Sequence, residues 1–193
     1  MGRLKAFDPD DALDRAMRTF WQHGYDATSV DDIVVSTGVN RASLYGTFGD
    51  KKQIFLRAFE RYVGASTVAN LDAATEPGSA REALVALFDR LVSRSCDGRN
   101  AGCMITNTVT EFGSRDPEVL AHARQALARI ENALDRLLRR AQAFGELPAD
   151  ADARARARHL MATMQGVQVI SKINSDPRLL KQICDQAIAA AFA

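Results

Sequence analysis

Apolar residues recur three and four positions apart along most of the chain, which is the spacing that lines one face of an α-helix. The first such stripe covers residues 10–23, and Gly24 follows it at a place where helices commonly end. Further stripes predict helices over residues 51–74, 79–95 and from 116 onward. Strand-favouring runs are scarce. We therefore predict an all-α protein of about nine helices.

Two short helices are predicted between the first helix and the fourth. Thr28 begins the earlier one as an N-terminal cap, with Asp31 three residues later in the manner of a capping box. This helix ends at Gly38, a residue that suits the positive φ of a tight turn. Asn40 caps the later helix, which extends to Tyr45 and is broken directly after it. Two short helices around a Gly-centred turn predict a helix-turn-helix, whose second helix enters the major groove of DNA.

The remaining pattern divides the chain without a flexible linker. Asp50 caps the fourth helix, and the segment 76–79, Glu-Pro-Gly-Ser, is the clearest interior break. The DNA-binding unit is predicted to end inside the fourth helix, which gives domains 1–56 and 57–193. The later domain is expected to contain helices at about residues 79–95, 103–112, 116–145, 150–173 and 177–190.

Composition narrows the class of protein. Of the 193 residues, 47% are hydrophobic, which is enough for a buried core. No stretch reaches the roughly 18 uncharged apolar residues of a membrane span, and acidic residues follow the first few positions, unlike a secretory signal. The three cysteines form no Cys-x-x-Cys pair, and the histidines are isolated. We expect a cytoplasmic protein that is not an enzyme and needs no metal or cofactor.

Net charge gives no support for nucleic-acid binding. The chain carries a formal charge of +1, and its first sixty residues hold eight Lys and Arg against nine Asp and Glu. A DNA-binding role must therefore depend on where individual charges lie on the surface.

Two segments resemble the TetR family of bacterial repressors. Residues 20–30 read Phe-Trp-Gln-His-Gly-Tyr-Asp-Ala-Thr-Ser-Val, and residues 37–45 read Thr-Gly-Val-Asn-Arg-Ala-Ser-Leu-Tyr. The similarity spans about residues 10–60, with apolar anchors, glycines, Tyr45 and the lysines in register. One departure is Gly46-Thr47, where the family often carries a basic residue or a histidine. The resemblance implies a regulator with an N-terminal helix-turn-helix domain and a C-terminal helical domain for effector binding and dimerisation.

The resemblance also implies which residues touch double-stranded operator DNA. Hydroxyls and N–H groups at the start of the second helix are expected at phosphates, and the start of the third helix is expected at base edges. Arg41 can pair bidentately with guanine. The same residue types also serve as plain caps or core, and the two roles are compatible. The implied contacts are Thr28, Ser29, Asn40, Arg41, Ala42, Ser43, Tyr45, Thr47 and Lys51.

A pocket for a small-molecule effector is expected among the helices after Ser79. Such sites have an apolar wall with a few polar groups, although each of these residues alone can be ordinary core. Buried amides at Asn107 and Gln168 would require partners. The candidate lining residues are Phe88, Cys103, Met104, Asn107, Thr108, Glu111, Met161, Met164, Gln165 and Gln168.

Cys103 supports an alternative trigger. Gly102-Cys103 before a short helix loosely resembles the electrophile- and redox-responsive branch of the family, and a helix N-terminus favours the reactive thiolate form. The other reading is a small buried hydrophobe.

The resemblance assigns the last two helices to a homodimer interface, while the same residues could instead close the core of one protomer. These residues are Leu160, Val167, Ile170, Leu180, Ile183, Ala187, Ile188 and Ala191. Three functions stay open: a repressor released by an effector, a repressor switched through Cys103, and a helical protein-interaction module.

Overall fold

The computed structural model describes residues 7–65, 78–96 and 101–193. Within these ranges every regular element is an α-helix, which confirms the predicted class. No helix of this described part combines the length and the apolar character needed to cross a lipid bilayer. The helices are α1 (Pro9–His23), α2 (Val30–Thr37), α3 (Arg41–Phe48), α4 (Lys51–Ala65), α6 (Ala80–Ser95), α7 (Met104–Phe112), α8 (Pro117–Ala143), α9 (Ala153–Ile170) and α10 (Pro177–Phe192).

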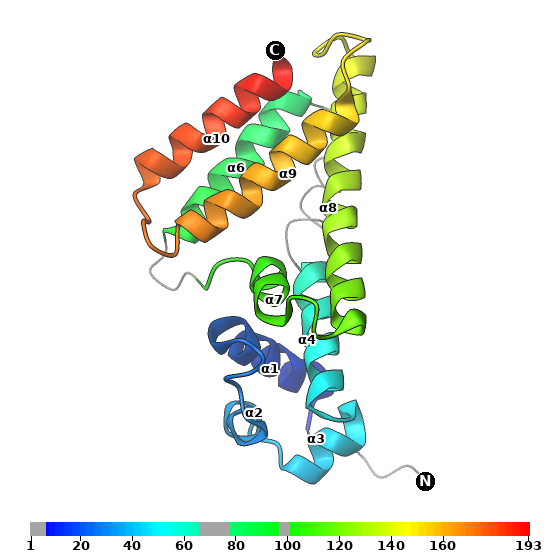
Figure 1. Ribbon diagram of the computed structural model, residues 1–193, viewed down its shortest axis with the longest axis vertical. Coiled ribbons are helices and arrows are strands. Elements are labelled where there is room, and N and C mark those ends of the chain that lie inside the picture. Colours follow the sequence, from blue (N-terminus) through cyan, green and yellow to red (C-terminus); the bar gives the residue numbers. More distant parts are fainter. Residues whose placement is uncertain (1–6, 66–77, 97–100) are drawn as a thin grey trace.

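The helices form two groups joined along α4, α7 and α8. Figure 1 shows α1, α2 and α3 at the end of the molecule nearer the N-terminus, and α6, α9 and α10 at the other end. The long helix α8 extends from the upper group down to the side of α4. The short helix α7 contacts both α4 and α8, so it lies where the two groups meet.

Most predicted helix ends agree with the structure, because local capping residues determine them. α1 ends at Gly24, whose φ is +84°, and α6 begins after Ser79, whose hydroxyl accepts the N–H of Glu82. α3 is longer than predicted and continues through residues 46 and 47, because the first residue after Tyr45 with a positive φ is Gly49, at +93°. The predicted extension of the fourth helix over residues 66–74 lies outside the described residues.

An aromatic cluster joins the two groups. The ring of Phe55 on α4 lies 5.2 Å from the ring of Phe20 on α1, between centroids, and 5.5 Å from that of Phe112 on α7. Tyr25, in the turn after α1, lies 5.1 Å from Phe55 and 5.0 Å from Phe112. Edge-to-face and tilted aromatic pairs at these distances add to the stabilisation from buried area. The cluster therefore fixes the first helix and its turn against α4 and α7.

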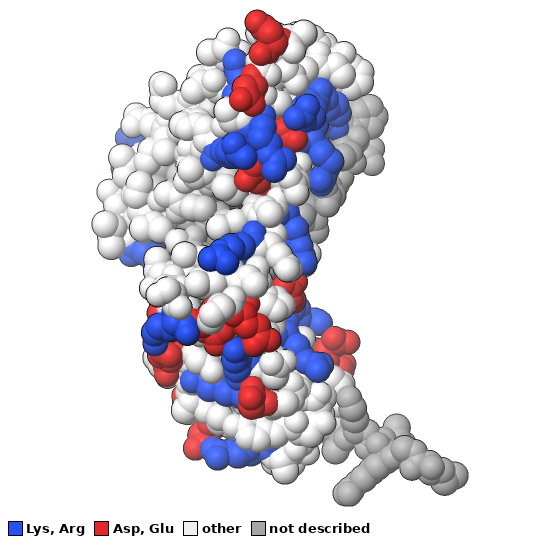
Figure 2. Space-filling model, turned by 45° about the vertical axis from the view of Figure 1, so that its right-hand side comes forward, with Lys and Arg blue, Asp and Glu red and all other residues white. Residues whose placement is uncertain are grey.

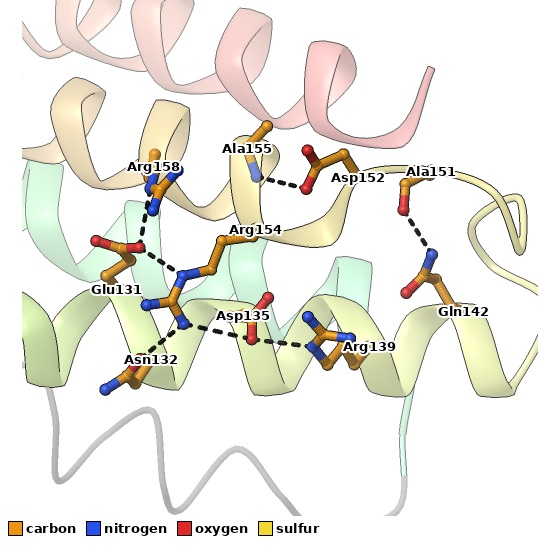
Figure 3. A network of polar contacts seen from close by, with 10 residues as sticks. All are labelled: Glu131, Asn132, Asp135, Arg139, Gln142, Ala151, Asp152, Arg154, Ala155 and Arg158. Carbon is orange, nitrogen blue, oxygen red and sulfur yellow. Dashed lines mark hydrogen bonds and ion pairs between the residues drawn. The ribbon is translucent and has the colours of Figure 1, made fainter.

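A polar network holds α8 against α9. Glu131 on α8 accepts hydrogen bonds from Arg154 and Arg158 on α9, at 2.6 Å and 3.0 Å from its Oε1 (Figure 3). Asp135, one turn further along α8, accepts from Arg139 at 3.0 Å and lies 3.7 Å from Arg154. The two acidic residues are largely buried, and their arginine partners compensate for part of the loss of hydration, since Asp135 Oδ1 has no hydrogen-bond partner among the described residues. This network therefore ties α8 to the group formed by α6, α9 and α10.

Candidate nucleic-acid interface and its junction

The helix-turn-helix begins with a capping box at Ser29. The Ser29 hydroxyl accepts the N–H of Asp32 at 3.1 Å, and the Asp32 carboxylate accepts the Ser29 N–H at 2.7 Å. The hydrogen bond from the Ser29 hydroxyl holds the pKa of the Asp32 carboxyl below its usual range, and the bond from the Ser29 N–H adds to this effect. The capping box is therefore displaced by one residue from the predicted pair, Thr28 and Asp31.

Thr28 does not face solvent. Its side chain is 1% exposed, and its hydroxyl donates to the carbonyl of Gly24 at 2.6 Å. The bond satisfies a main-chain oxygen at the end of α1. The expected contact between this hydroxyl and a DNA phosphate is therefore inconsistent with the structure.

The turn between α2 and α3 is fixed by local hydrogen bonds. Gly38 has φ +71° and ψ 13°, the left-handed conformation that its position predicts. The Thr37 hydroxyl donates to the carbonyl of Ile33 at 2.6 Å and accepts the N–H of Val39 at 3.2 Å. Asn40 caps α3 by accepting the N–H of Ser43 at 2.9 Å, as predicted. The direction of α3 is therefore set by the turn itself.

Six of the residues predicted to contact DNA lie on α3 or at its N-terminal cap. Asn40, Arg41, Ala42 and Tyr45 are exposed, whereas Ser43 and Thr47 are half-buried. Lys51, at the first position of α4, is half-buried too, and its ammonium lies 4.2 Å from the centre of the Tyr25 ring. We call the six predicted contact residues of α3 and its cap, together with Ser29, Asp31 and Lys51, the reading face. The six residues are Asn40, Arg41, Ala42, Ser43, Tyr45 and Thr47.

Charges of both signs lie on this end of the molecule. In Figure 2 the lowest part of the protein shows basic and acidic side chains side by side, with no uniform basic surface on the visible side. On the reading face, Arg41 Nη2 lies 2.8 Å from Asp31 Oδ1, and both side chains are mostly exposed. Sequence reasoning did not find this pair, because ten residues separate its members and it forms only once α2 and α3 cross.

A carboxylate from α7 holds the turn between α1 and α2. Glu111 accepts the main-chain N–H of Tyr25 at 2.9 Å and that of Asp26 at 2.6 Å. A side chain on Gly24 would come within 3.0 Å of the same carboxylate, so the turn leaves little room there. Arg115, just after α7, forms an ion pair with Asp26 at 2.9 Å. Glu111 was predicted to line an effector pocket, but its carboxylate is engaged with the main chain of the helix-turn-helix.

Further polar contacts connect α4 to α8. Lys52 lies 2.7 Å from both Asp116 and Glu118 at the start of α8. Its hydrogen bond to Asp116, and then that to Glu118, raises the pKa of Lys52, while the same bond lowers the pKa of the Asp116 carboxyl. Glu60, two turns further along α4, contacts His122 at 2.8 Å and Arg129 at 3.0 Å. We call these contacts, the Glu111 contacts and the aromatic cluster the junction.

The other predicted pocket residues are divided between core and polar contacts. Asn107 donates to the carbonyl of Ala101 at 2.8 Å and accepts from the Lys172 ammonium at 2.7 Å. Gln165 accepts from the hydroxyl of Thr106 through its Oε1, and its Nε2 is buried without a hydrogen-bond partner among the described residues. Met161 and Gln168 are half-buried. The fully buried members are Phe88, Cys103, Met104, Thr108 and Met164, and the Thr108 hydroxyl donates to the Met104 carbonyl.

The residues predicted for the dimer interface lie mainly inside the protomer. Helix α9 packs against α8 and α10, and α10 also packs against α6, so their apolar stripes face the protomer's own core. Ile170 and Ile183 are half-buried and partly available at the surface. The remaining six are at most 4% exposed, which removes them from a direct contact with a partner: Leu160, Val167, Leu180, Ala187, Ile188 and Ala191.

Two family models match the chain. Residues 12–58 match a model described as bacterial regulatory proteins of the tetR family. Residues 78–187 match one described as a tetracyclin repressor-like C-terminal domain. The first of these contains the whole helix-turn-helix, and the second contains α6–α9 and most of α10.

Curated relatives and solved structures agree with these models. The chain is 33% identical over 191 residues to the HTH-type transcriptional regulator YezE of Bacillus subtilis (strain 168), covering 98% of each protein. It is 33% identical over 186 residues to the HTH-type transcriptional repressor ComR of Escherichia coli (strain K12), covering 94% of this chain and 88% of ComR. A structure of a cysteine variant of the regulator CifR with 26-base-pair operator DNA is similar with a TM-score of 0.86. It is 27% identical, and the match covers 98% of this chain and 99% of that one. This chain therefore belongs to the TetR family of transcriptional regulators.

Proposed function

We propose that this protein is a repressor that binds operator DNA as a homodimer and leaves it when a small-molecule effector binds. The observation that carries the DNA-binding part is the exposed first turn of α3, with Arg41 at its first position. The names of ComR, a repressor, and of the operator complex of CifR support the same assignment for this chain. Because the chain belongs to a family of transcriptional regulators, we no longer propose the third function, a helical protein-interaction module.

The proposed contacts keep the predicted set with one change. Asn40, Arg41 and Ala42 face base edges, and Arg41 pairs with guanine through two N–H groups. Tyr45 and Lys51 reach phosphates beside them. Thr28 leaves the set because its hydroxyl is bonded to Gly24. The remaining members are Ser29, Ser43 and Thr47.

The proposed dimer uses the outer faces of α9 and α10. Val169 on α9 is 49% exposed, and Ile173, just beyond this helix, is 91% exposed. Together with the half-buried Ile170 and Ile183, they offer apolar surface that a second copy would cover. Sedimentation at micromolar concentration tests this proposal. Wild type is expected to be a dimer, and Ile183→Asp and Val169→Asp are expected to shift it towards monomer.

The proposed release follows from the junction. We expect α7 or α8 to take different positions in the DNA-binding state and the released state of the protein. An effector bound among α6, α7, α8 and α9 favours the released state only if it binds that state more tightly. Helix α4 passes from domain 1–56 to domain 57–193 without a linker, and Glu111 on α7 accepts two main-chain N–H groups of the first domain. The reading face is therefore expected to move when α7 or α8 moves. The two reading faces of a dimer then no longer match successive major grooves.

A chemical crosslink tests this route. Cysteines at positions 52 and 118 replace an ion pair between α4 and α8, and a short bismaleimide can join them. The crosslinked protein is expected to bind operator and to resist release by effector. The single variant Lys52→Cys, treated in the same way, is the control. Release that persists after crosslinking would contradict transmission through the junction.

Modification of Cys103 is the second candidate trigger. Cys103 occupies the N-cap position of α7, and its thiol interacts with the hydroxyl of Tyr62, so a group added there would displace α7. Its side chain is 4% exposed, which limits access by a reagent and favours the small-molecule trigger. Cys103→Ser separates the two: it is expected to keep a response to effector and would abolish every response if the thiol were the sensor.

The first experiment measures DNA binding directly. Fluorescence anisotropy compares DNA from the region upstream of the protein's own gene with scrambled DNA, for wild type and Arg41→Ala. Tight binding to the upstream DNA that the variant loses supports the proposal. Equal weak binding of both proteins to both DNAs, confirmed with a genome-wide selection, would refute it.

A further inference from the structure

We infer that Asp31 is a specificity-determining residue, which positions Arg41 for one guanine and weakens binding to other sequences. This inference rests on the proposed function, because it assumes that the start of α3 reads operator DNA. Asp31 was not among the residues predicted to contact DNA, and its predicted role as a helix cap belongs to Asp32.

The geometry assigns the two neighbouring carboxylates to different tasks. Asp32 closes the capping box with Ser29 and so stabilises the start of α2. Asp31, beside it, points instead across to α3, where its Oδ1 lies 2.8 Å from Arg41 Nη2. Only one hydrogen bond of Asp31 is found among the described residues. Helix α2 therefore does not need the Asp31 side chain for its cap.

The pair contributes little to the stability of the fold. The Arg41 side chain is 56% exposed and that of Asp31 is 80% exposed. Exposed ion pairs contribute little to stability because solvent screens them and two long side chains must be ordered. We therefore look for the function of the pair in the contacts that Arg41 can still make with DNA while it is bonded to Asp31.

A held guanidinium can still read a base. Arginine has five N–H donors in a fixed planar fork, and Asp31 occupies one of them at Nη2. The other N–H groups remain available for the O6 and N7 acceptors of guanine in the major groove. Because Asp31 fixes the plane of the fork before DNA arrives, less side-chain freedom is lost on binding, and the guanine contact is favoured over looser phosphate contacts.

The carboxylate also disfavours wrong sequences and non-specific DNA. Asp31 brings a negative charge to a surface that must approach phosphates, in a domain that has no excess of basic residues. On the base edges a carboxylate can accept only from an amino group, as on cytosine N4 or adenine N6, and it repels the acceptors of other bases. Specificity is gained here through a repulsive element as well as an attractive one.

The experiment compares the sequences that each variant selects from a pool of random duplex DNA. The variants are Asp31→Asn, Arg41→Ala, the double variant of both, and Asp50→Asn. Asp50→Asn is the matched control: it also removes one exposed negative charge beside the reading face, but Asp50 caps α4 through the N–H of Gln53 and does not touch Arg41. Asparagine is an equally good cap, so α4 is preserved. Circular dichroism and thermal unfolding confirm that each variant folds.

Wild type is expected to select a guanine at one position of each half-site, and Asp31→Asn to lose about tenfold of that preference. Asp31→Asn and Asp50→Asn are both expected to bind the unselected pool more tightly than wild type. Only Asp31→Asn is expected to lose preference for guanine. The double variant is expected to match Arg41→Ala, since Asp31 acts through Arg41.

Three outcomes would overturn the inference; the first two leave the proposed function intact, and the third also removes Arg41 from its proposed contact with guanine. The guanine preference of Asp31→Asn equals that of wild type, or Asp50→Asn loses it to the same extent, or Arg41→Ala retains it. If wild type enriches no sequence from the pool, the proposed DNA-binding function fails as well, so the two failures are distinguishable.

Discussion

The reading face and the junction use their polar groups in opposite ways. On the reading face, Arg41 and Tyr45 are exposed, and the Arg41 ion pair with Asp31 lies open to water. At the junction, the Glu111 carboxylate meets two main-chain N–H groups, and Lys52 meets two carboxylates. One region keeps its hydrogen-bonding groups accessible to a partner, and the other has already satisfied them within the chain.

This difference teaches where movement can be transmitted. A rigid connection requires contacts that are satisfied and partly buried, since those are costly to break. The helix-turn-helix is held at three places: through the continuous helix α4, through Glu111 on α7, and through the ion pairs that Lys52 on α4 forms with the start of α8. The position of the reading face therefore depends on α7 and α8 as well as on α4.

Removing the centre of the junction is expected to have the largest effect. Phe55 is 2% exposed and contacts rings on α1 and α7. Phe55→Ala is expected to lower the free energy of unfolding by about 3–5 kcal/mol, measured by urea unfolding, because it leaves a cavity among several rings. Phe144, at 75% exposure, supplies the control, and Phe144→Ala is expected to change stability by less than about 0.5 kcal/mol. Similar losses for the two variants would refute the central role of the cluster.

Glu111→Ala breaks the junction at its polar side. Two main-chain N–H groups, those of Tyr25 and Asp26, lose their acceptor, and the first of them is partly buried. The expected loss is about 1–3 kcal/mol of unfolding free energy. Hydrogen exchange followed by mass spectrometry is expected to show faster exchange in the turn after α1. Glu111→Gln retains one neutral acceptor and is expected to fall between alanine and wild type; unchanged exchange in both variants would contradict the clamp.

The comparison also explains which features could be predicted from the sequence. Gly38, Asn40 and Gly24 act on residues within a few positions, so their roles at the ends of α1, α2 and α3 follow from local chemistry. The capping box was displaced by one residue because the spacing fits two pairs equally well, Thr28 with Asp31 and Ser29 with Asp32. Only the burial of Thr28 selects Ser29.

Long-range roles could not be predicted in the same way. Glu111 is 85 residues from Asp26, and no spacing in the chain indicates that they meet. Periodicity correctly placed Leu160 and Leu180 on covered faces of their helices. It could not say what covers them, because a helix packed on more than one side has no single buried face. The chain therefore indicated which residues avoid water without indicating whether a protomer or a partner covers them.

Two glycines near the reading face, Gly38 after α2 and Gly46 within α3, test how backbone conformation affects its stability. Gly38 has a left-handed conformation, whereas Gly46 lies within α3, and an added methyl group would meet no atom within 4 Å at either. Backbone conformation alone then decides the outcome. Gly38→Ala is expected to destabilise the protein by about 1 kcal/mol, and Gly46→Ala to stabilise it by about 0.5–1 kcal/mol. Thermal unfolding measures both, and equal shifts of one sign would contradict the assigned conformations.

The smallest expected effect is the acid sensitivity of the contact between α4 and α8. Burial raises the pKa of Glu60, but hydrogen bonds to His122 and Arg129 outweigh it and hold the pKa below its usual value. The folded protein therefore binds this proton less readily than the unfolded chain. The contact contributes its full stability above the ordinary glutamate pKa of about 4.3 and loses it as the pH falls through the folded value.

Glu60→Gln isolates this contribution. Unfolding free energies of wild type and variant, measured between pH 3 and pH 6, are expected to differ by less than about 1 kcal/mol at pH 6 and to converge towards pH 3. Convergence locates a pH-dependent part of stability at the junction, since the reading-face residues stay unchanged in this variant. A difference that is constant across the range would mean that Glu60 acts through packing, and its ion pairs with His122 and Arg129 on α8 would then contribute nothing to holding the reading face in place.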